Sequence, residues 1–157
     1  MSHCLLKAVG VQDLNMYGEH DNFNPNSSHV IPALLKKFIE AKESGERSVE
    51  VWGDGSASRE FLYAGDCAEA IHLALEGYDS PEPVNIGTGK EISIKDLVYL
   101  LRDIVGFDGK IVFDPSKPNG QPRRCLDTSK AEKEFGFKAS TPLREGLDKT
   151  YNWYINS

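Results

Sequence analysis

Short strand patterns alternate with amphipathic helix patterns along this chain, and this alternation is the feature that most constrains its fold. Apolar residues recur at helical spacing from Ile31 to Ile39, and "VEVW" at 49–52 alternates like a short strand. Strands that are separated by helices favour parallel pairing in an α/β fold. The strand patterns are few and short, so we predict a small mixed α/β lobe rather than a complete doubly wound sheet.

The remaining segments continue the alternation. The patterns predict further helices at about 66–76, 94–104, 129–135 and from 143 onward, and further strands at 83–87 and 110–113. Ser93 with Asp96 resembles a capping box at the start of one helix, and Gly136 is placed to end another. In the first segment, "VGVQ" at 9–12 could be a stub of a strand.

Composition narrows the class of protein. Hydrophobic residues make up 39% and charged residues 27%, and no apolar run reaches the roughly 20 residues that span a bilayer. A net charge of -6 weighs against a broad nucleic-acid surface. The 3 cysteines are far apart and the histidines show no ligand spacing, so we expect no disulfide framework, no metal site and a cytoplasmic protein.

The segment "DNFNPNSSHVIPALLKK" places one histidine, His29, where a helix begins. An imidazole there could bond a main-chain group, or it could donate to a ligand and move a proton near neutral pH. Lys37, eight residues on, shares its side of the helix better than Lys36 does. Both lysines could equally be solvated surface residues.

Two further segments combine cations with flat or amide side chains. "WGDGSASREF" holds Trp52 and Arg59, which could stack a base and bind a phosphate, or could be a core residue and a surface ion-pair partner. "SKPNGQPRR" holds Asn119 and Arg124, which could read a base edge and bind a phosphate, or could belong to a basic surface loop.

Several catalytic signatures are missing from the sequence. It contains no G-x-G-x-x-G loop, no Tyr-x-x-x-Lys pair and no Gly-x-Ser-x-Gly elbow, and "NIGTG" is a poor phosphate loop. The residues alone therefore leave open whether the chain is an enzyme.

The motifs together resemble a known family. "NMYGEHDNFNPNSSHVIPALLKKF", "VEVWGDGSASREFLY", "PVNIGTGKEISIKDL" and "FDPSKPNGQPRRCLDTSKAEKEFGF" are similar to the C-terminal part of the GDP-L-fucose synthases, from about Asn15 to Tyr154. These are extended short-chain dehydrogenase/reductases. They epimerise GDP-4-keto-6-deoxy-D-mannose and then reduce it with NADPH, so the resemblance implies NADP as cofactor and a GDP-sugar as ligand.

The resemblance also implies roles for individual residues. Asn15 and Met16 match the segment that passes the nicotinamide end of the cofactor. His29 matches the histidine at the junction of cofactor and sugar, where it is implicated in proton transfer. The positions that match substrate contacts are Lys37, Trp52, Arg59, Asn119 and Arg124.

The chain departs from the family at its N-terminal end. Residues 1–14 do not match, so we divide the chain into 1–14 and a substrate-binding lobe at 15–157. The Rossmann half, with its glycine-rich loop and catalytic Ser, Tyr and Lys, is absent from this sequence. We therefore expect a GDP-sugar-binding portion that is inactive alone and that exposes apolar surface to a partner chain or a second copy. Three alternatives are a complementing subunit for a separately encoded Rossmann half, a non-catalytic remnant, and part of another sugar-nucleotide epimerase.

Overall fold

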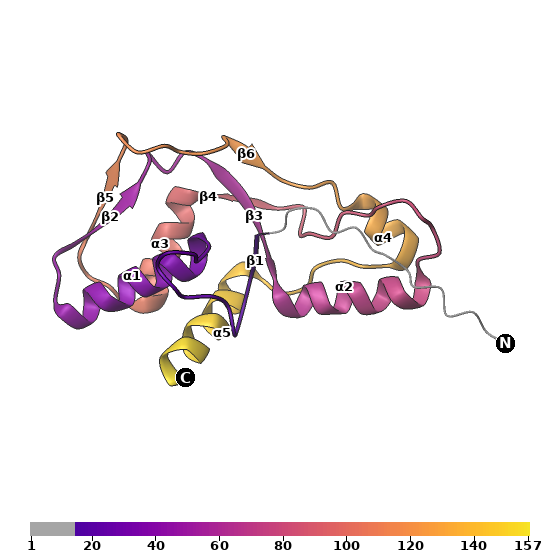
Figure 1. The fold of residues 1–157 in the computed structure, drawn as a ribbon, viewed down its shortest axis with the longest axis horizontal. Helices are drawn as coiled ribbons and strands as arrows, with labels where there is room; N and C mark the ends of the chain where they lie inside the picture. The colour runs from indigo at the N-terminus through magenta and orange to yellow at the C-terminus, as the bar shows by residue number, and fades with distance from the viewer. Residues whose placement is uncertain (1–14) are drawn as a thin grey trace.

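The computed structural model describes residues 15–157, so the possible strand at 9–12 lies outside the described residues (Figure 1). The helices are α1 (Val30–Ser44), α2 (Ala64–Gly77), α3 (Ile94–Val105), α4 (Ser129–Phe135) and α5 (Leu143–Asn156). The strands are β1 (Asn15–Tyr17), β2 (Ser48–Trp52), β3 (Ser58–Tyr63), β4 (Glu91–Ser93), β5 (Lys110–Asp114) and β6 (Arg123–Arg124). The predicted mixed α/β architecture is confirmed.

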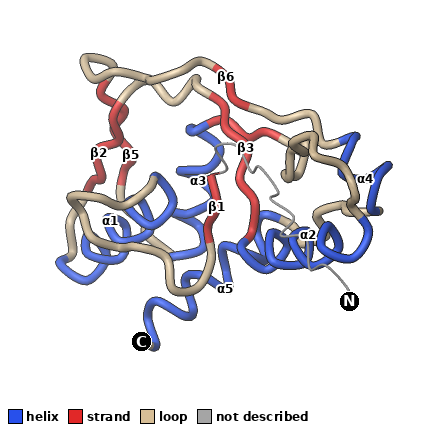
Figure 2. Tube along the Cα trace, turned by 45° about the vertical axis from the view of Figure 1, so that its right-hand side comes forward, coloured by secondary structure: helices blue, strands red, loops and turns tan. Residues whose placement is uncertain are grey.

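Two small sheets organise the chain. β3 is the centre of one sheet: it pairs parallel with β1 and β6 and antiparallel with β4. β2 and β5 form the other sheet as a parallel pair. Figure 2 shows β3 running between the β2–β5 pair on one side and the α2–α4 side of the molecule on the other.

The apolar residues form two cores, one on each side of β3. The larger core lies among α1, α3, α5 and the β2–β5 pair, and it includes the fully buried Leu35, Phe38 and Leu101. The smaller core lies between α2 and α4, where Ala70, Ile86 and Phe137 are buried. In Figure 1 the α2–α4 side therefore extends away from the helices of the larger core.

Local signals set the ends of the helices. Ser93 Oγ accepts a hydrogen bond from the Asp96 N–H at 3.0 Å, which satisfies one of the free N–H groups at the start of α3. Gly106 ends that helix in the left-handed conformation at φ 69°, and Gly136 ends α4 at φ 71°. The predicted N-cap at Ser93 and the predicted end of α4 are both confirmed.

The predicted strand at 83–87 is wrong. No strand is assigned to these residues, although Val84 and Ile86 are buried in the smaller core. Their apolar alternation reflects burial against α2 and α4 rather than pairing in a sheet.

Among residues 15–157, no helix is both long enough and apolar enough to cross a bilayer.

Candidate functional site

Arg59 and Arg124 lie side by side on neighbouring strands. The parallel pair β3–β6 sets Ser58 opposite Arg123 and Arg59 opposite Arg124. Adjacent strands are about 4.8 Å apart, and residues directly opposite each other project from the same face of the sheet. Both arginines are half-buried, and the Arg59 Nη1 donates to the Ser58 carbonyl at 2.6 Å. The structure thus brings two of the predicted phosphate-binding cations together.

Arg123 has a different role from its neighbour. Its Nε donates to both carboxylate oxygens of Glu91 on β4, at 3.0 and 2.9 Å, and Ser58 Oγ donates to the same carboxylate at 2.9 Å. The hydrogen bond from Arg123 and that from Ser58 lower the pKa of Glu91. Because successive residues of a strand point to opposite faces, this ion pair leaves Arg124 on the face of Arg59.

Two loops meet beside the arginine pair. Asn119 Oδ1 accepts the Asp54 N–H at 2.8 Å, which joins the loop after β2 to the loop before β6. A Cβ on Gly53, at φ 82°, would lie 2.2 Å from that same oxygen. A Cβ on Gly120 would lie 3.3 Å from Nη2 of Arg59, so the loop passes directly against this guanidinium.

Trp52 lies at the end of β2, next to these loops. Its side chain is 65% exposed, so it is not the core residue that the sequence left possible. The Lys117 ammonium lies over its ring, 5.7 Å from the centroid. An exposed indole ring can stack a base while a guanidinium holds a phosphate. Lys117 belongs to the "SKPNGQPRR" segment, but sequence reasoning did not select it.

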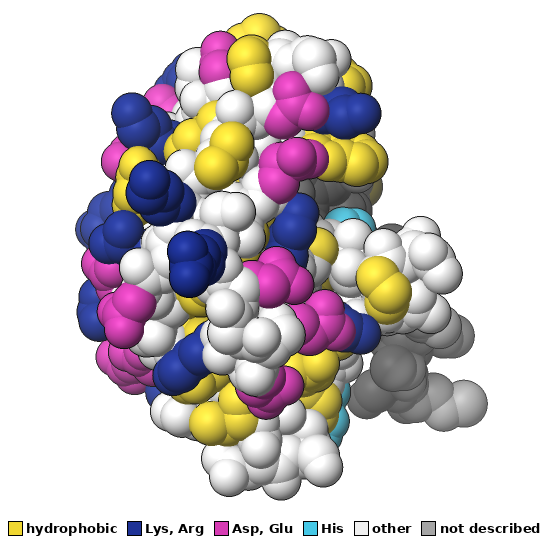
Figure 3. Space-filling view, turned by 90° about the vertical axis from the view of Figure 1, so that its left-hand side faces the viewer, with side chains coloured by type: hydrophobic (Ala, Val, Ile, Leu, Met, Phe, Trp, Pro, Cys, Tyr) yellow, Lys and Arg dark blue, Asp and Glu magenta, His cyan; other side chains and the backbone are white. Residues whose placement is uncertain are grey.

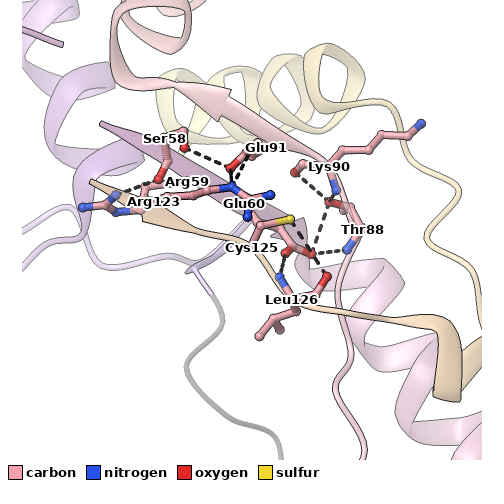
Figure 4. A network of polar contacts seen from close by, with 9 residues as sticks. All are labelled: Ser58, Arg59, Glu60, Thr88, Lys90, Glu91, Arg123, Cys125 and Leu126. Atoms are coloured by element: carbon pink, nitrogen blue, oxygen red, sulfur yellow. Dashed lines mark hydrogen bonds and ion pairs between the residues drawn. The ribbon is translucent and has the colours of Figure 1, made fainter. Parts of the chain in front are cut away.

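A second residue that the sequence reasoning missed is Glu60, which follows Arg59 on β3. Its carboxylate is buried, and it accepts the N–H groups of Thr88 at 2.5 Å, Gly89 at 2.9 Å and Leu126 at 2.7 Å (Figure 4). The "NIGTG" segment is therefore a turn fastened by a carboxylate, rather than a phosphate loop. A charged residue in a strand pattern gives no sequence signal for this role, because the groups that Glu60 binds lie 28 to 66 residues further along the chain.

Cys125 is the residue between Arg124 and Leu126. Burial, followed by the nearby Glu60 carboxylate, raises the pKa of its thiol. At neutral pH it is therefore a protonated thiol, and the reactive thiolate form is scarce.

Lys37 contacts the free edge of β2. Its ammonium donates to the Glu50 carbonyl, two residues before Trp52, while its side chain remains exposed. Lys36 turns instead toward the polar loop, where it donates to the Phe23 carbonyl at 3.4 Å and lies 3.8 Å from Glu40. The structure therefore places Lys37, and not Lys36, on the Trp52 side of α1.

His29 precedes the first residue of α1 and is exposed. Its side chain makes no capping hydrogen bond, and its carbonyl accepts the Ala33 N–H at 3.0 Å. Among residues 15–157, the imidazole therefore does not cap the helix that it precedes.

Aromatic packing fixes the loop that leads to His29. Phe23 stacks on Tyr154 at 4.0 Å between centroids, and the His20 ring lies 4.7 Å from that of Trp153. These contacts fasten the loop to the last turns of α5. His29 is therefore presented by an anchored loop rather than by a free one.

Asn15 and Met16 occupy β1, beside the second half of β3. The Asn15 amide donates to the Glu60 carbonyl at 3.1 Å, and Met16 is 46% exposed at a pocket of about 150 Å³. Burial raises the pKa of the adjacent Tyr17, and burial followed by a hydrogen bond to Glu19 raises that of Tyr63. Both phenols are protonated at neutral pH, so neither can act as a proton acceptor there.

Asn15 and Met16 are the two positions that match the cofactor segment of the family. Asn15 is committed to the main chain of β3, and Met16 offers only apolar surface. Within residues 15–157, no group of three or more His, Cys, Asp or Glu side chains is arranged to hold a metal ion. On the face in Figure 3, basic, acidic and apolar side chains are mixed rather than gathered into one basic surface.

Comparison with known proteins places these features in a family. The sequence profile described as "NAD dependent epimerase/dehydratase family" matches residues 2–87, more than half of the chain. The match begins inside the segment 1–14, and the boundary at residue 14 stays a prediction. A rice protein (Oryza sativa subsp. japonica) named probable GDP-L-fucose synthase 1 is 47% identical over 150 residues, which are 96% of this chain and 45% of that protein.

Solved structures agree with the sequence comparison. A GDP-L-fucose synthetase from Naegleria fowleri superimposes with a TM-score of 0.88 at 30% identity, over 95% of this chain and 46% of that one. A structure of a GDP-L-fucose synthetase from the same organism bound to NADP gives a TM-score of 0.85 at 31% identity, over 90% of this chain and 44% of that one. The chain thus spans a little under half the length of the relatives that it matches.

Proposed function

This chain belongs to the NAD dependent epimerase/dehydratase family, and on that premise we propose that residues 15–157 bind the GDP-sugar in a GDP-L-fucose synthase reaction. In that reaction GDP-4-keto-6-deoxy-D-mannose is epimerised and then reduced with NADPH. The arginine pair, Arg59 beside Arg124, is the observation that carries the proposal. Two guanidinium groups on neighbouring strands match the charge of a diphosphate, and each can bind phosphate oxygens in a bidentate manner.

The residues around this pair complete a nucleotide site. Trp52 offers its exposed ring to the guanine base, and Lys117 adds a cation beside that ring. Asn119 already uses its carbonyl oxygen to accept the Asp54 N–H, so its amide nitrogen is the group left to donate to the O6 or N7 acceptors of guanine. Lys37 donates to the Glu50 carbonyl, two residues before Trp52, and adds positive charge on the α1 side of the site.

We assign proton transfer during epimerisation to His29. His29 is exposed at the start of α1 and makes no capping hydrogen bond, so its imidazole can face a bound sugar and exchange a proton with it. Hydride transfer needs the cofactor, and the described residues provide neither a dinucleotide site nor an activated tyrosine. We therefore propose that residues 15–157 alone bind the GDP-sugar without turning it over.

A partner is expected at the apolar face of α2. Ile71 is 42% exposed and Leu75 is 55% exposed, and residues four apart lie on one side of a helix. We propose that a cofactor-binding chain, or a second copy of this chain, covers this face. Cys67 and Cys125 are both free thiols, as expected for a reducing compartment such as the cytoplasm.

Nuclear magnetic resonance titration of the isotopically labelled chain tests the proposed site. GDP and GDP-mannose should shift the amide signals of residues 52–59 and 117–124, whereas UDP should shift them less. UDP binding as tight as GDP binding would favour another sugar-nucleotide epimerase. Shifts confined to other residues would contradict the proposed site.

A further inference from the structure

We propose that Glu60 is a positioning residue that holds Arg124 beside Arg59, an inference that rests on the diphosphate site proposed above. Glu60 does not belong to the exposed surface of that site. It is 5% exposed, and it reaches the binding groups only through the main chain. Its importance follows from how weakly β6 is held by its own pairing.

β6 consists of Arg123 and Arg124 alone. A strand of this length has few ladder hydrogen bonds, so its register on β3 needs support from both of its ends. Before β6, the Ser58 N–H donates to the Pro122 carbonyl at 2.9 Å. After β6, the Leu126 N–H donates to the Glu60 Oε2 at 2.7 Å. Glu60 therefore fastens the chain directly after Arg124.

The other carboxylate oxygen fastens a different segment. Glu60 Oε1 accepts the N–H groups of Thr88 and Gly89, at 2.5 and 2.9 Å. A Cβ on Gly87 would lie 2.2 Å from the same oxygen, so the turn packs tightly against the carboxylate. Figure 4 shows Glu60 between this turn and Leu126, so a single side chain holds two loops to β3.

Three N–H donors thus converge on two acceptor oxygens. A glutamine at this position would have the same size, but it would replace one acceptor oxygen with an NH₂ donor. One of the three N–H groups would then face another donor, which costs free energy in a buried site. An aspartate would keep two acceptor oxygens on a side chain that is one methylene shorter. The pair of variants therefore separates loss of an acceptor from loss of reach.

The test compares Glu60→Gln and Glu60→Asp with the unaltered chain, and uses Glu43→Gln on the exposed side of α1 as a matched control. The first readout is amide hydrogen exchange without ligand. Loss of a charge-assisted hydrogen bond contributes about 1.5–3 kcal/mol, so exchange at Leu126 should rise about 10- to 100-fold in Glu60→Gln. The exchange rate of Val51 in the β2–β5 sheet should be the same in all variants. In Glu60→Asp, the exchange rate of Leu126 should lie between the rates of the unaltered chain and of Glu60→Gln.

The second readout is binding of inorganic pyrophosphate, which probes the arginine pair without the base. Glu60→Gln should bind it about tenfold more weakly, about 1.4 kcal/mol, while Glu43→Gln should bind it as the unaltered chain does. Glu60→Asp should recover part of the loss.

The two readouts separate the inference from the proposed function. Unchanged exchange at Leu126 in a folded Glu60→Gln variant would overturn the inference, as would unchanged pyrophosphate binding. Absence of pyrophosphate binding in the unaltered chain would refute the diphosphate site, and with it the positioning role, even if exchange at Leu126 showed that Glu60 fastens β6. If Glu60→Gln does not fold, Glu60→Asp is the test: faster exchange at Leu126 together with weaker pyrophosphate binding would support the positioning role, and no change in either would overturn it.

Discussion

Arg59 on β3 lies directly opposite Arg124 on β6, in a parallel pair whose two strands come from distant parts of the sequence. Two neighbouring guanidinium groups repel each other unless an anion lies between or beside them. A diphosphate bound beside the two guanidinium groups would offset this repulsion. The predictions below concern this pair and the elements that hold it.

Replacing Arg124 with lysine should weaken GDP binding although the charge is kept. A lysine ammonium binds phosphate as a point charge, whereas a guanidinium can bind two oxygens at once. We expect the GDP dissociation constant to rise about tenfold in Arg124→Lys. Arg102→Lys on α3, where Arg102 pairs with Asp103 at 2.8 Å, serves as the control and should leave GDP binding unchanged. Equal binding by Arg124→Lys and the unaltered chain would argue against bidentate contact.

Gly53→Ala should destabilise the site more than a comparable glycine substitution elsewhere. Gly53 and Gly45 both have positive φ, at 82° and 68°, so each alanine costs roughly 1–2 kcal/mol of strain. Only at Gly53 would the new Cβ meet Asn119, since nothing lies within 4 Å of a Cβ at Gly45. Chemical denaturation should give a larger loss of unfolding free energy for Gly53→Ala, by about 1 kcal/mol from the broken Asp54–Asn119 hydrogen bond. Identical losses for the two variants would show that this contact is not formed.

Trp52 should report the bound base by fluorescence. Its exposed ring is available to stack on a base. Trp153, on α5, packs instead against His20 and Phe23. GDP should quench the emission of the unaltered chain and of Trp153→Phe, but not that of Trp52→Phe. Since stacking on an aromatic ring contributes about 1–3 kcal/mol, Trp52→Ala should also bind GDP at least several-fold more weakly. Quenching that persists in Trp52→Phe would place the base elsewhere.

The ion pair between Glu91 and Arg123 should make stability depend on pH in the acid range. The folded state lowers the pKa of Glu91 below its ordinary value of 4.5, so this pair stabilises the fold above pH 4.5 and loses its effect as the pH falls through the folded pKa. Arg123→Ala should therefore be less stable than the unaltered chain at pH 7. The difference should shrink as the pH falls below 4.5 and through the lowered pKa of Glu91, because the protonated carboxyl no longer pairs with Arg123. A difference that stays constant across this range would mean that the two side chains do not interact.

The exposed apolar face of α2 should drive association of the isolated chain. Ile71 and Leu75 lie four residues apart, whereas Ile155 on α5, at 49% exposed, is separated from them in the fold. Light scattering should show less association for the double variant Ile71→Gln/Leu75→Gln, and no change for Ile155→Gln. A sharp monomer peak for the unaltered chain would contradict this expectation.

The parts of the fold that depend on neighbouring residues were predictable from the sequence. The start of α3 follows from Ser93 and Asp96, and the end of α4 follows from Gly136. The predicted β2 and β5 agree with the structure within a residue at each end, because β2 alternates apolar and polar residues and β5 is a short apolar run. Each of these features is determined by residues that are close together in the sequence, so a short stretch of chain is enough to predict it.

The strands that set up the site were not predictable in the same way. β1, β4 and β6 have two or three residues each, too few to show a period. They exist because β3 offers them partners, and this pairing joins residues far apart in the sequence. The sequence could name Arg59 and Arg124 as cations, but only the β3–β6 register shows that they are neighbours. The same reason explains why Glu60, whose carboxylate binds main-chain N–H groups of two other segments, gave no signal.

The most direct test of the account is a GDP titration of the unaltered chain, Arg59→Ala, Arg124→Ala and the double variant, followed by nuclear magnetic resonance. We predict a dissociation constant of the order of 1 mM for the unaltered chain, because the described residues provide one side of the site. Each single variant should lose about 1.5–3 kcal/mol of binding free energy, and the double variant should show no measurable binding. A double variant that binds GDP as the unaltered chain does would contradict the account.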